Sequence, residues 1–341
     1  MANSVTLYDV ARRAGVSVAT ASRAFNGSAT RVVGEQLRER VMKAAAELGY
    51  APNVNAQAMV RGRTNMVGLV VQDIADPYFS TVASGVMLEA EAQGLLVTMA
   101  STQRNPDAEI DYIGTFRRNW ARVIIIVGTR FAERSVTDRL ADELAAFESG
   151  GGRAVAISQP RLPIDTVAID NRAGARELAY ALHDLGHRRF AVLAGPRNLL
   201  TASDRLRGFR EALARKGAPL LPQHVIHGEF TRDGGYNATI ELLKEQPDIS
   251  CVFAVNDVMA VGAMAALRDQ GVELPGAMAV AGFDDIATLG DIFPSLTTVR
   301  IPLSDLGAQA LRLALDNSAE RPRILDVKGE VVLRESTPRI P

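Results

Sequence analysis

The chain has 341 residues, of which 47% are hydrophobic and 23% are charged, and its formal net charge is −1. These are ordinary globular values, so they exclude a chain that is disordered throughout, and the length favours two or three domains. A charge near zero argues against a nucleic-acid partner only if the charge is evenly spread. Residues 1–65 instead hold nine Lys and Arg against four Asp and Glu, a net charge of +5, so the remainder carries −6. A basic N-terminal segment on an acidic remainder predicts a nucleic-acid-binding end.

The cysteine content and the apolar runs predict a cytoplasmic location. The single cysteine, Cys251, lies in an apolar run, cannot form an internal disulfide and is expected to be buried and unreactive. The N-terminal stretch is polar and lacks the apolar segment of a secretory signal. Because no uninterrupted apolar run approaches the length of a membrane span, we expect no membrane partner.

Three short helices are predicted in the first 50 residues, over 7–14, 18–25 and 35–48. Thr6 and Asp9 form an approximate capping box for the first helix, Gly15 ends it, and Ser17 caps the second. The turn between these helices is so short that they must cross at a steep angle, which is the helix-turn-helix arrangement.

The second helix carries side chains that suit the edges of bases in a major groove. Val18 and Ala19 offer apolar contacts for a thymine methyl group, and Arg23, near Thr20, can donate two hydrogen bonds to guanine. An ordinary helical hairpin is the alternative. The basic charge, the tight turn and the caps together favour DNA binding.

Residues 51–65 are predicted to form a linker. Pro52 breaks the chain after the third helix, and residues 53–63 could form a helix that is too short to be stable alone. We expect this segment to become ordered only with a partner.

From Met66 onward, short β-branched runs alternate with helical stretches. Continuous apolar runs between helices indicate buried parallel strands in doubly wound α/β sheets. Because so many strands would overfill one sheet, two lobes are predicted. The expected strands are 67–71, 95–99, 123–127, 154–157, 167–169, 190–193, 251–255 and 279–281. Ligands of such folds bind beyond the carboxyl ends of the strands.

Two groups of candidate ligand-binding residues follow strands and begin helices. Tyr78 and Phe79, next to Asp76, could stack on a ligand ring, or they could be core aromatics behind a helix cap. In the pair Asn256 and Asp257, one residue can cap a helix while the other binds a ligand.

Three further candidates would complete a polar, aromatic site. Arg205 can grip vicinal hydroxyls or a carboxylate with two N–H groups, and Asp284 can accept hydrogen bonds from hydroxyls. Phe230 can form a stacking wall, whereas Asp170 could contact a ligand or only cap a helix. Aromatic walls with Asp, Asn and Arg are typical of a sugar or polyol site.

No cofactor or metal is predicted. His183 and His187 are separated by the helix-ending Gly186, and His224 and His227 flank a two-residue strand and face opposite sides. The phosphate-binding glycine motifs and the nucleophile motif of hydrolases are missing from the sequence.

The N-terminal residues closely resemble a known signature. Residues 6–27 match, without a gap, the N-terminal pattern of the lactose/galactose repressor (LacI/GalR) family. Family motifs continue at 48–53, 62–65, 170–171, 186–188, 195–196, 205 with 208–209, 256–257 and 282–284. The resemblance therefore covers essentially the whole chain.

This resemblance implies a transcription regulator whose dimer binds a pseudo-palindromic operator in double-stranded DNA, and whose periplasmic-binding-protein-like body senses a small effector. It implies a helix-turn-helix domain over 1–50, a hinge helix over 51–65 and an effector-binding domain over 66–341. One lobe is expected at about 66–163 and 295–325, and the other at about 164–294 and 326–341. The implied DNA contacts are Thr6, Leu7, Ser17, Val18, Ala19, Thr20, Ser22, Arg23, Asn26, Asn53, Ala56, Gln57 and Met59. The implied effector contacts are Asp76, Tyr78, Phe79, Arg205, Phe230, Asn256 and Asp284.

Four residues depart from the family pattern. Met59 stands where the family usually has the leucine that opens a base step in the minor groove, and it can serve as an apolar wedge or as helix packing. Gln57 replaces a frequent arginine. Ala21 and Ala24 replace bulkier apolar residues, which puts the tightness of the head's core in question.

The leading hypothesis is a cytoplasmic, dimeric regulator, expected to repress carbohydrate-utilisation genes, that is not an enzyme. A pure ligand-binding or transport protein is opposed by the missing signal peptide, and a nucleotide-dependent enzyme by the missing phosphate loops. Leu199 and Leu200 disfavour a purine effector, and the missing C-terminal tetramerising helix favours a dimer.

Overall fold

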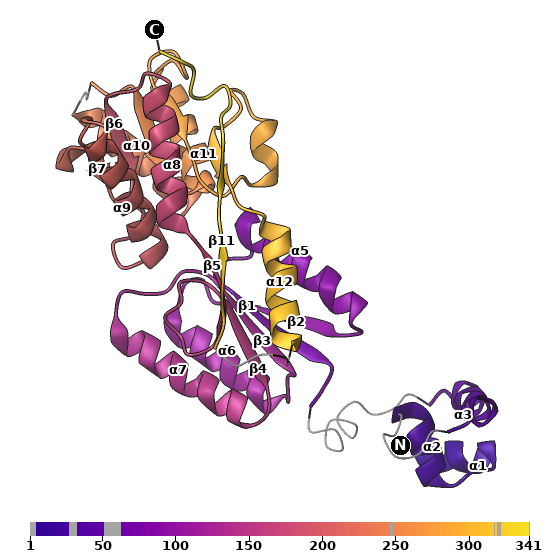
Figure 1. Cartoon of the computed structure of the whole chain (residues 1–341). Helices are drawn as coiled ribbons and strands as arrows, with labels where there is room; N and C mark the ends of the chain where they lie inside the picture. Colours follow the sequence, from indigo (N-terminus) through magenta and orange to yellow (C-terminus); the bar gives the residue numbers. More distant parts are fainter. Residues whose placement is uncertain are drawn as a thin grey trace. The chain divides into compact units, whose positions relative to one another are not determined.

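The computed structural model describes residues 5–26, 33–50, 63–245, 248–316, 318 and 322–340. The chain divides into two compact units, Met1–Thr64 and Asn65–Pro341 (Figure 1). Residues 51–62 of the predicted hinge, 51–65, lie outside the described residues.

The described residues of the N-terminal unit form three helices, and all three were predicted. They are α1 (Leu7–Ala14), α2 (Val18–Asn26) and α3 (Glu35–Leu48). Thr6 and Asp9 form the capping box, Gly15 ends α1 with φ +64°, and Ser17 Oγ accepts from the Thr20 amide at 3.1 Å. The small core of this unit contains Ala21 and Ala24, both buried, so the two alanines fill positions inside it.

The first lobe of the second unit is a six-stranded parallel sheet in the order β11-β5-β4-β3-β1-β2. Its strands are β1 (Met66–Val71), β2 (Leu96–Ser101), β3 (Val123–Val127), β4 (Arg153–Ile157), β5 (Asp165–Ile169) and β11 (Ile324–Val327). Helices α6 (Pro106–Arg118) and α7 (Arg134–Ser149) pack on one face of the sheet, and α5 (Pro77–Ala92) and α12 (Leu303–Leu315) on the other (Figure 1). In β3, Ile124 and Ile126 face α6 and α7 while Ile125 faces the opposite layer, as the two-residue period of a strand requires.

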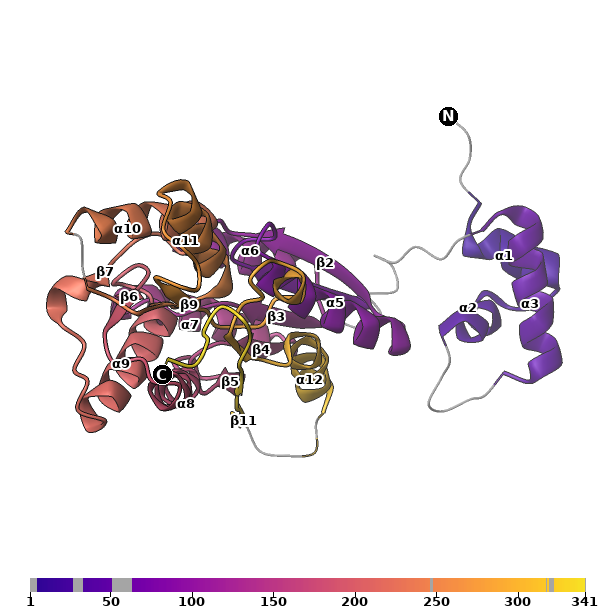
Figure 2. The same cartoon turned by 90° about the horizontal axis from the view of Figure 1, so that it is seen from above.

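The second lobe is a four-stranded parallel sheet in the order β7-β6-β8-β9. Its strands are β6 (Phe190–Leu193), β7 (Val225–Ile226), β8 (Cys251–Ala254) and β9 (Ala279–Ala281). Helices α8 (Asn171–Asp184) and α9 (Leu200–Arg215) pair on one side, and α10 (Arg232–Lys244) and α11 (Asp257–Asp269) on the other (Figure 2). A short antiparallel pair, β10 (Thr298–Arg300) and β12 (Glu330–Val332), completes the lobe, with the 3-10 turns η1 (Pro222–His224) and η2 (Ala287–Gly290).

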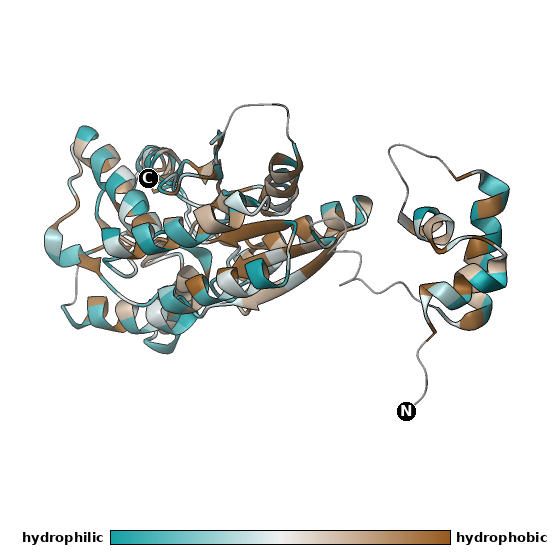
Figure 3. Ribbon diagram, turned by 90° about the horizontal axis from the view of Figure 1, so that it is seen from below, coloured by the Kyte–Doolittle hydropathy of each residue, from teal (hydrophilic) through white to brown (hydrophobic). Residues whose placement is uncertain are grey.

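The hydropathy of the residues explains why helices cover both faces of the first sheet. The strands of the first sheet are brown, and the helices that cover them turn teal faces outward (Figure 3). β3 is buried at all five positions, which is the pattern of a central parallel strand.

The expected limits of the lobes are wrong at two points. We expected the second lobe to begin at residue 164, but β5 pairs with β4 and β11 in the first sheet. We expected residues 295 onward to return to the first lobe, but Thr297 bridges to Ala281 and Arg300 to Asp284 in the second lobe. An apolar run shows that a strand exists, whereas its sheet is chosen by long-range pairing that the run does not encode.

Candidate functional site

A cavity in the second unit gathers all seven predicted effector residues. Its empty volume is about 530 Å³, including its open mouth. The seven are Asp76, Tyr78, Phe79, Arg205, Phe230, Asn256 and Asp284. The other lining residues are Gln72, Arg104, Gly128, Thr129, Ile157, Ser158, Gln159, Ile169, Asn171 and Thr201. Most of them directly follow strands of one lobe or the other, as expected of a doubly wound fold. That these residues bind a ligand remains a prediction.

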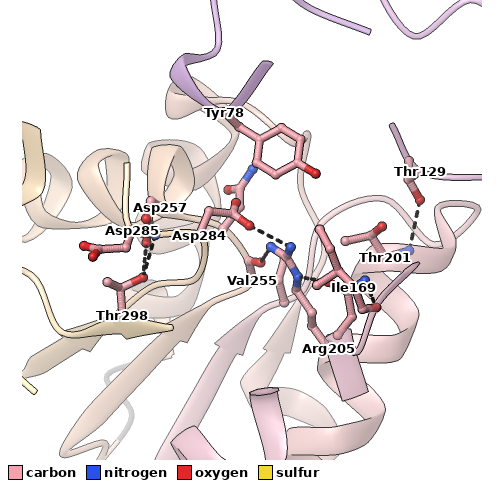
Figure 4. Close-up of polar contacts among 12 residues, drawn as sticks. Tyr78, Thr129, Ile169, Thr201, Arg205, Val255, Asp257, Asp284, Asp285 and Thr298 are labelled. Atoms are coloured by element: carbon pink, nitrogen blue, oxygen red, sulfur yellow. Dashed lines mark hydrogen bonds and ion pairs between the residues drawn. The ribbon is translucent and has the colours of Figure 1, made fainter. Parts of the chain in front are cut away.

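Arg205 organises the second-lobe wall of the cavity (Figure 4). Its side chain is 2% exposed, and its Nε donates to Asn171 Oδ1 at 2.8 Å. Its Nη1 donates to the Val255 carbonyl oxygen at 2.7 Å, and its Nη2 to Asp284 Oδ1 at 2.7 Å. The guanidinium also lies 3.7 Å from the ring centroid of Phe283. Three of its five N–H groups thus hold it in place, which leaves two for a ligand.

Asp284 is held in a backbone conformation that L-residues rarely adopt. Its φ is +117°, and φ of the next residue, Asp285, is +55°. Such strain costs on the order of 1–3 kcal/mol per residue and persists only where the surroundings impose it. Here the Asp284 amide donates to the Val299 carbonyl oxygen at 2.9 Å, and Asp285 pairs with Arg300 and Arg334. Burial raises the pKa of Asp284, and the Arg205 guanidinium opposes that rise.

Contrary to our expectation, Asn256 and Asp257 do not split into one helix cap and one ligand-binding residue. Asn256 both caps α11, accepting from the Met259 amide at 3.0 Å, and lines the cavity. Asp257 is 1% exposed and accepts from the Ile286 amide at 3.0 Å and from Thr298 Oγ1 at 2.7 Å. Its role is to join α11 to the segments after β9, and burial raises its pKa to about 8.

On the first-lobe wall, Asp76 caps α5 by accepting from the Tyr78 amide at 3.0 Å. Burial raises the pKa of Asp76 to about 6. The rings of Tyr78 and Phe79 stand edge to face with centroids 5.0 Å apart. Phe79 belongs to the hydrophobic core, whereas Tyr78 is half-buried and lies beside Asp284 and Arg205 (Figure 4).

Sequence reasoning missed Arg104 as a cavity residue. It follows β2 with φ +60°, donates from Nη2 to the Phe230 carbonyl oxygen at 3.1 Å, and pairs with Asp73 at 3.3 Å. This hydrogen bond joins the two lobes. A lone arginine after a strand is a weak signal, because arginine is common in this chain.

A second connection between the lobes was also missed, and we call residues 129–132 with 198–201 the inter-lobe clasp. Phe131 forms an antiparallel bridge with Leu199, and the Leu200 amide donates to the Arg130 carbonyl oxygen at 3.0 Å. The Thr201 amide donates to Thr129 Oγ1 at 3.0 Å. These two amides belong to the first turn of α9, whose N-cap residue Leu199 makes no side-chain cap. The first lobe therefore caps the helix that carries Arg205.

A buried ion pair supports the clasp. Arg130 is 2% exposed and donates from Nη1 and Nη2 to both carboxylate oxygens of Glu109 on α6, at 3.0 and 2.8 Å. Gln159 adds a further connection, because its Oε1 accepts from the Arg130 amide and its Nε2 donates to Thr201 Oγ1 at 2.8 Å.

The predicted DNA contacts gather on the N-terminal unit where the structure describes them. Ser17, Val18 and Ala19 are exposed at the start of α2, and Arg23 is half-buried one turn later. Ser17 Oγ and Thr20 Oγ1 lie 2.8 Å apart. Thr6 and Leu7 begin α1, and Ser22 is half-buried on α2. The Asn26 side chain and the predicted hinge contacts lie outside the described residues: Asn53, Ala56, Gln57 and Met59.

Other chemistry receives no support from the described part of the chain. Within it, no group of three or more His, Cys, Asp or Glu side chains could hold a metal ion. Cys251 is buried, and burial raises the pKa of its thiol. Among the described helices none is long and apolar enough to cross a bilayer.

Comparisons with known proteins agree with this geometry. A profile described as "Bacterial regulatory proteins, lacI family" matches residues 6–53, and one described as "Periplasmic binding proteins and sugar binding domain of LacI family" matches residues 64–327. The HTH-type transcriptional regulator DegA of Bacillus subtilis is 32% identical over 340 residues, which cover 97% of this chain and 98% of DegA.

Two solved structures extend the likeness to the fold. The lac repressor dimer bound to operator and the anti-inducer ONPF has a TM-score of 0.83 at 26% identity, covering 98% of this chain and 100% of that one. The transcriptional regulator CelR in complex with cellobiose has a TM-score of 0.71 at 30% identity, covering 97% and 99%. The resemblance and the two-lobed fold predicted from the motifs are confirmed, and the chain belongs to the lacI family of bacterial regulatory proteins.

Proposed function

We propose that this protein is a homodimeric repressor of carbohydrate-utilisation genes, and that a small sugar or polyol controls its binding to a pseudo-palindromic operator. One observation carries the proposal. Arg205, Asp284, Asn256 and Asp76 converge with aromatic side chains on one cavity between two lobes, in a chain that begins with a helix-turn-helix. Hydroxyl groups both donate and accept hydrogen bonds, so a polyol suits this mixture of carboxylate, amide and guanidinium groups.

Control would work through the relative positions of the lobes. Arg205 and Asn256 belong to the second lobe, whereas Asp76 and Tyr78 belong to the first, so a ligand touching both groups favours one arrangement of the lobes. One arrangement of the lobes binds DNA and the other does not. The coupling free energy between effector and operator is limited by the difference between the free energies with which the effector binds these two arrangements.

The pocket is proposed to bind its ligand rather than to transform it. Arg205, Asp284 and Asn256 are each engaged in hydrogen bonds that hold helices in place, a rigid arrangement suited to recognition. A regulator that binds operator DNA must be in the compartment that contains the chromosome, so we propose a cytoplasmic location.

The proposed dimer would use an exposed apolar face on the first lobe. Leu88 on α5 is 63% exposed, and Leu96 on the edge strand β2 is 70% exposed. Ile74, Met87 and Met99 are exposed nearby, and Ile74, Met87, Leu88 and Met99 line one shallow groove. Contiguous apolar surface of this kind is typical of a protein–protein interface.

A thermal-shift screen of sugars and polyols tests the proposal. We expect at least one of them to raise the melting temperature of the full chain and of a chain lacking residues 1–64. Arg205→Ala is expected to abolish the ligand-induced rise in melting temperature. In a separate experiment, only the full chain is expected to bind a DNA sequence selected from a random library. Retained ligand binding by Arg205→Ala, or DNA selection by the shortened chain, would contradict the proposal.

A further inference from the structure

We propose that the cavity selects uncharged, hydroxyl-rich ligands and rejects phosphorylated or otherwise anionic ones, with Asp76 as the residue that sets this preference. The inference rests on the proposed effector site and names the class of effector that it takes.

The two arginines that line the cavity already face carboxylates. Arg205 Nη2 lies 2.7 Å from Asp284 Oδ1, and Arg104 Nη1 lies 3.3 Å from Asp73 Oδ2. Asp76 adds a third carboxylate, so these five groups carry a net charge of −1 when all are ionised. The remaining lining side chains are uncharged. An anionic ligand would therefore meet cationic groups whose charge is already balanced by a carboxylate.

The helix N-termini around the cavity offer an anion little more. Three helices begin there, and in each the side chain of the N-cap residue accepts a hydrogen bond from a main-chain amide of the first turn. These N-cap residues are Asp76 for α5, Asp170 for α8 and Asn256 for α11. The fourth, α9, is capped by the inter-lobe clasp. In each of these four first turns, at least one main-chain amide of the kind that binds phosphate is thus bonded to one of the protein's own oxygens, and two of the side-chain caps are carboxylates.

Asp76 is the carboxylate near the cavity whose cationic neighbour is farthest away, because it shares Arg104 with Asp73 and lies at the longer distance of the two. Its side chain is 9% exposed and lines the cavity. Its Oδ1 accepts from the Tyr78 amide, whereas its Oδ2 is 4.0 Å from Arg104 Nη2, too far for a hydrogen bond. A ligand hydroxyl can donate to this oxygen, whereas a phosphate beside it would place like charges together away from water.

The groups that remain for a ligand are of mixed kind. Among the described lining residues, these groups include Asp76 Oδ2 and Asp284 Oδ2 as acceptors, and Asn256 Nδ2 and two Arg205 N–H groups as donors. Alternating donors and acceptors match a run of sugar hydroxyls, each of which can do both. A fully ionised phosphate accepts only, so it would leave the Asp76 oxygen without a donor.

Matched pairs of probes test the inference on the full chain. The probes are glucose with glucose 6-phosphate, galactose with galactose 1-phosphate, and ribose with ribose 5-phosphate, titrated by calorimetry after a thermal-shift screen. We expect the neutral member of a bound pair to have the lower Kd. Asp76→Asn keeps a side-chain cap on α5 and removes the charge, so the ratio of the two Kd values should fall by about tenfold or more.

Two further variants separate charge from folding. Asp76→Ser also keeps an uncharged side-chain cap on α5. It should lower the ratio of the Kd of the phosphorylated probe to the Kd of the neutral probe, as Asp76→Asn does. Asp170→Asn makes the same chemical change at a cap that does not line the cavity, and it should leave the ratio unchanged.

Three outcomes would overturn the inference. Tighter binding of a phosphorylated probe by the unaltered protein would overturn it while leaving the proposed effector site standing, and so would an unchanged ratio in both Asp76 variants. Absence of binding by every neutral and phosphorylated probe would count against the inference and the proposed sugar effector together.

Discussion

The main-chain amide of Thr201 donates to the side-chain oxygen of Thr129 across the cleft, at 3.0 Å. This bond caps the first turn of α9, the helix that presents Arg205 to the cavity, with an oxygen from the other lobe. An arrangement of the lobes that separated Thr129 from Thr201 would leave the Thr201 amide without this cap.

The cap predicts a specific loss on mutation. Thr129→Val removes the acceptor oxygen with little change of shape, and we expect it to lower the free energy of unfolding by about 1 kcal/mol, the usual value of a helix cap. Thr201→Val is the comparison variant, because it keeps the amide that donates to Thr129 and removes the side-chain contact of Thr201 to Gln159. Urea unfolding gives the energies, and solution scattering should show a larger radius of gyration for Thr129→Val. Equal radii for Thr129→Val and the unaltered protein would contradict the role of the clasp in closure.

The buried pair of Arg205 and Asp284 predicts a larger effect. Arg205→Ala leaves the Asp284 carboxylate buried without its partner, so the expected loss is roughly 3–5 kcal/mol of unfolding free energy. Arg207→Ala, two residues along α9 at an exposed position, should change stability by less than about 0.5 kcal/mol. Chemical denaturation measures both, and comparable losses in the two variants would refute the assigned role of Arg205.

Asp76 predicts a dependence of stability on pH. Its pKa is about 6 in the folded protein and 3.8 for an ordinary aspartate, so between these values the folded chain holds a proton that the unfolded chain has released. Stability from this group is therefore gained as pH falls through 6. From pH 7 to pH 5, the unaltered protein should gain about 1 kcal/mol relative to Asp76→Asn. Urea unfolding at the two pH values checks this, and a relative loss on acidification would show the sign to be wrong.

The exposed apolar face of the first lobe predicts the assembly state. Leu88→Glu places a charge in the proposed interface, so we expect it to convert the dimer to a monomer in light scattering coupled to size-exclusion chromatography. Leu221→Glu, at a 44% exposed leucine of the second lobe, is the control and should remain dimeric. A dimeric Leu88→Glu protein would place the interface elsewhere.

Local signals in the sequence were sufficient for the elements and for most of the site. The capping box of Thr6 and Asp9, the glycine at 15 and the apolar runs each act over a few residues, so the three head helices and eight of the body strands could be predicted, whereas β10 and β11 were not. The seven effector residues could be placed in one site by the family resemblance, supported for those that follow strands by the rule that the carboxyl ends of parallel strands meet at one edge.

The parts that could not be predicted depend on contacts between distant segments. β5 joins the first sheet between β4, which directly precedes it, and β11, about 160 residues away in the sequence. The clasp pairs residues 129–132 with 198–201, neither of which carries a motif, and Arg104 reaches the Phe230 carbonyl oxygen from a loop with a positive φ. Such partners are chosen by the assembled fold rather than by local propensity.

Operator affinity measured with and without effector tests the central claim most directly. The operator is selected from a random DNA library, the effector is the probe that raises the melting temperature, and fluorescence anisotropy gives the Kd for DNA. We predict that the effector changes this Kd at least about tenfold, a typical allosteric coupling, in the unaltered protein and leaves it unchanged in Asp284→Asn. An equal change in both proteins, or no change in the unaltered protein at saturating effector, would contradict the account.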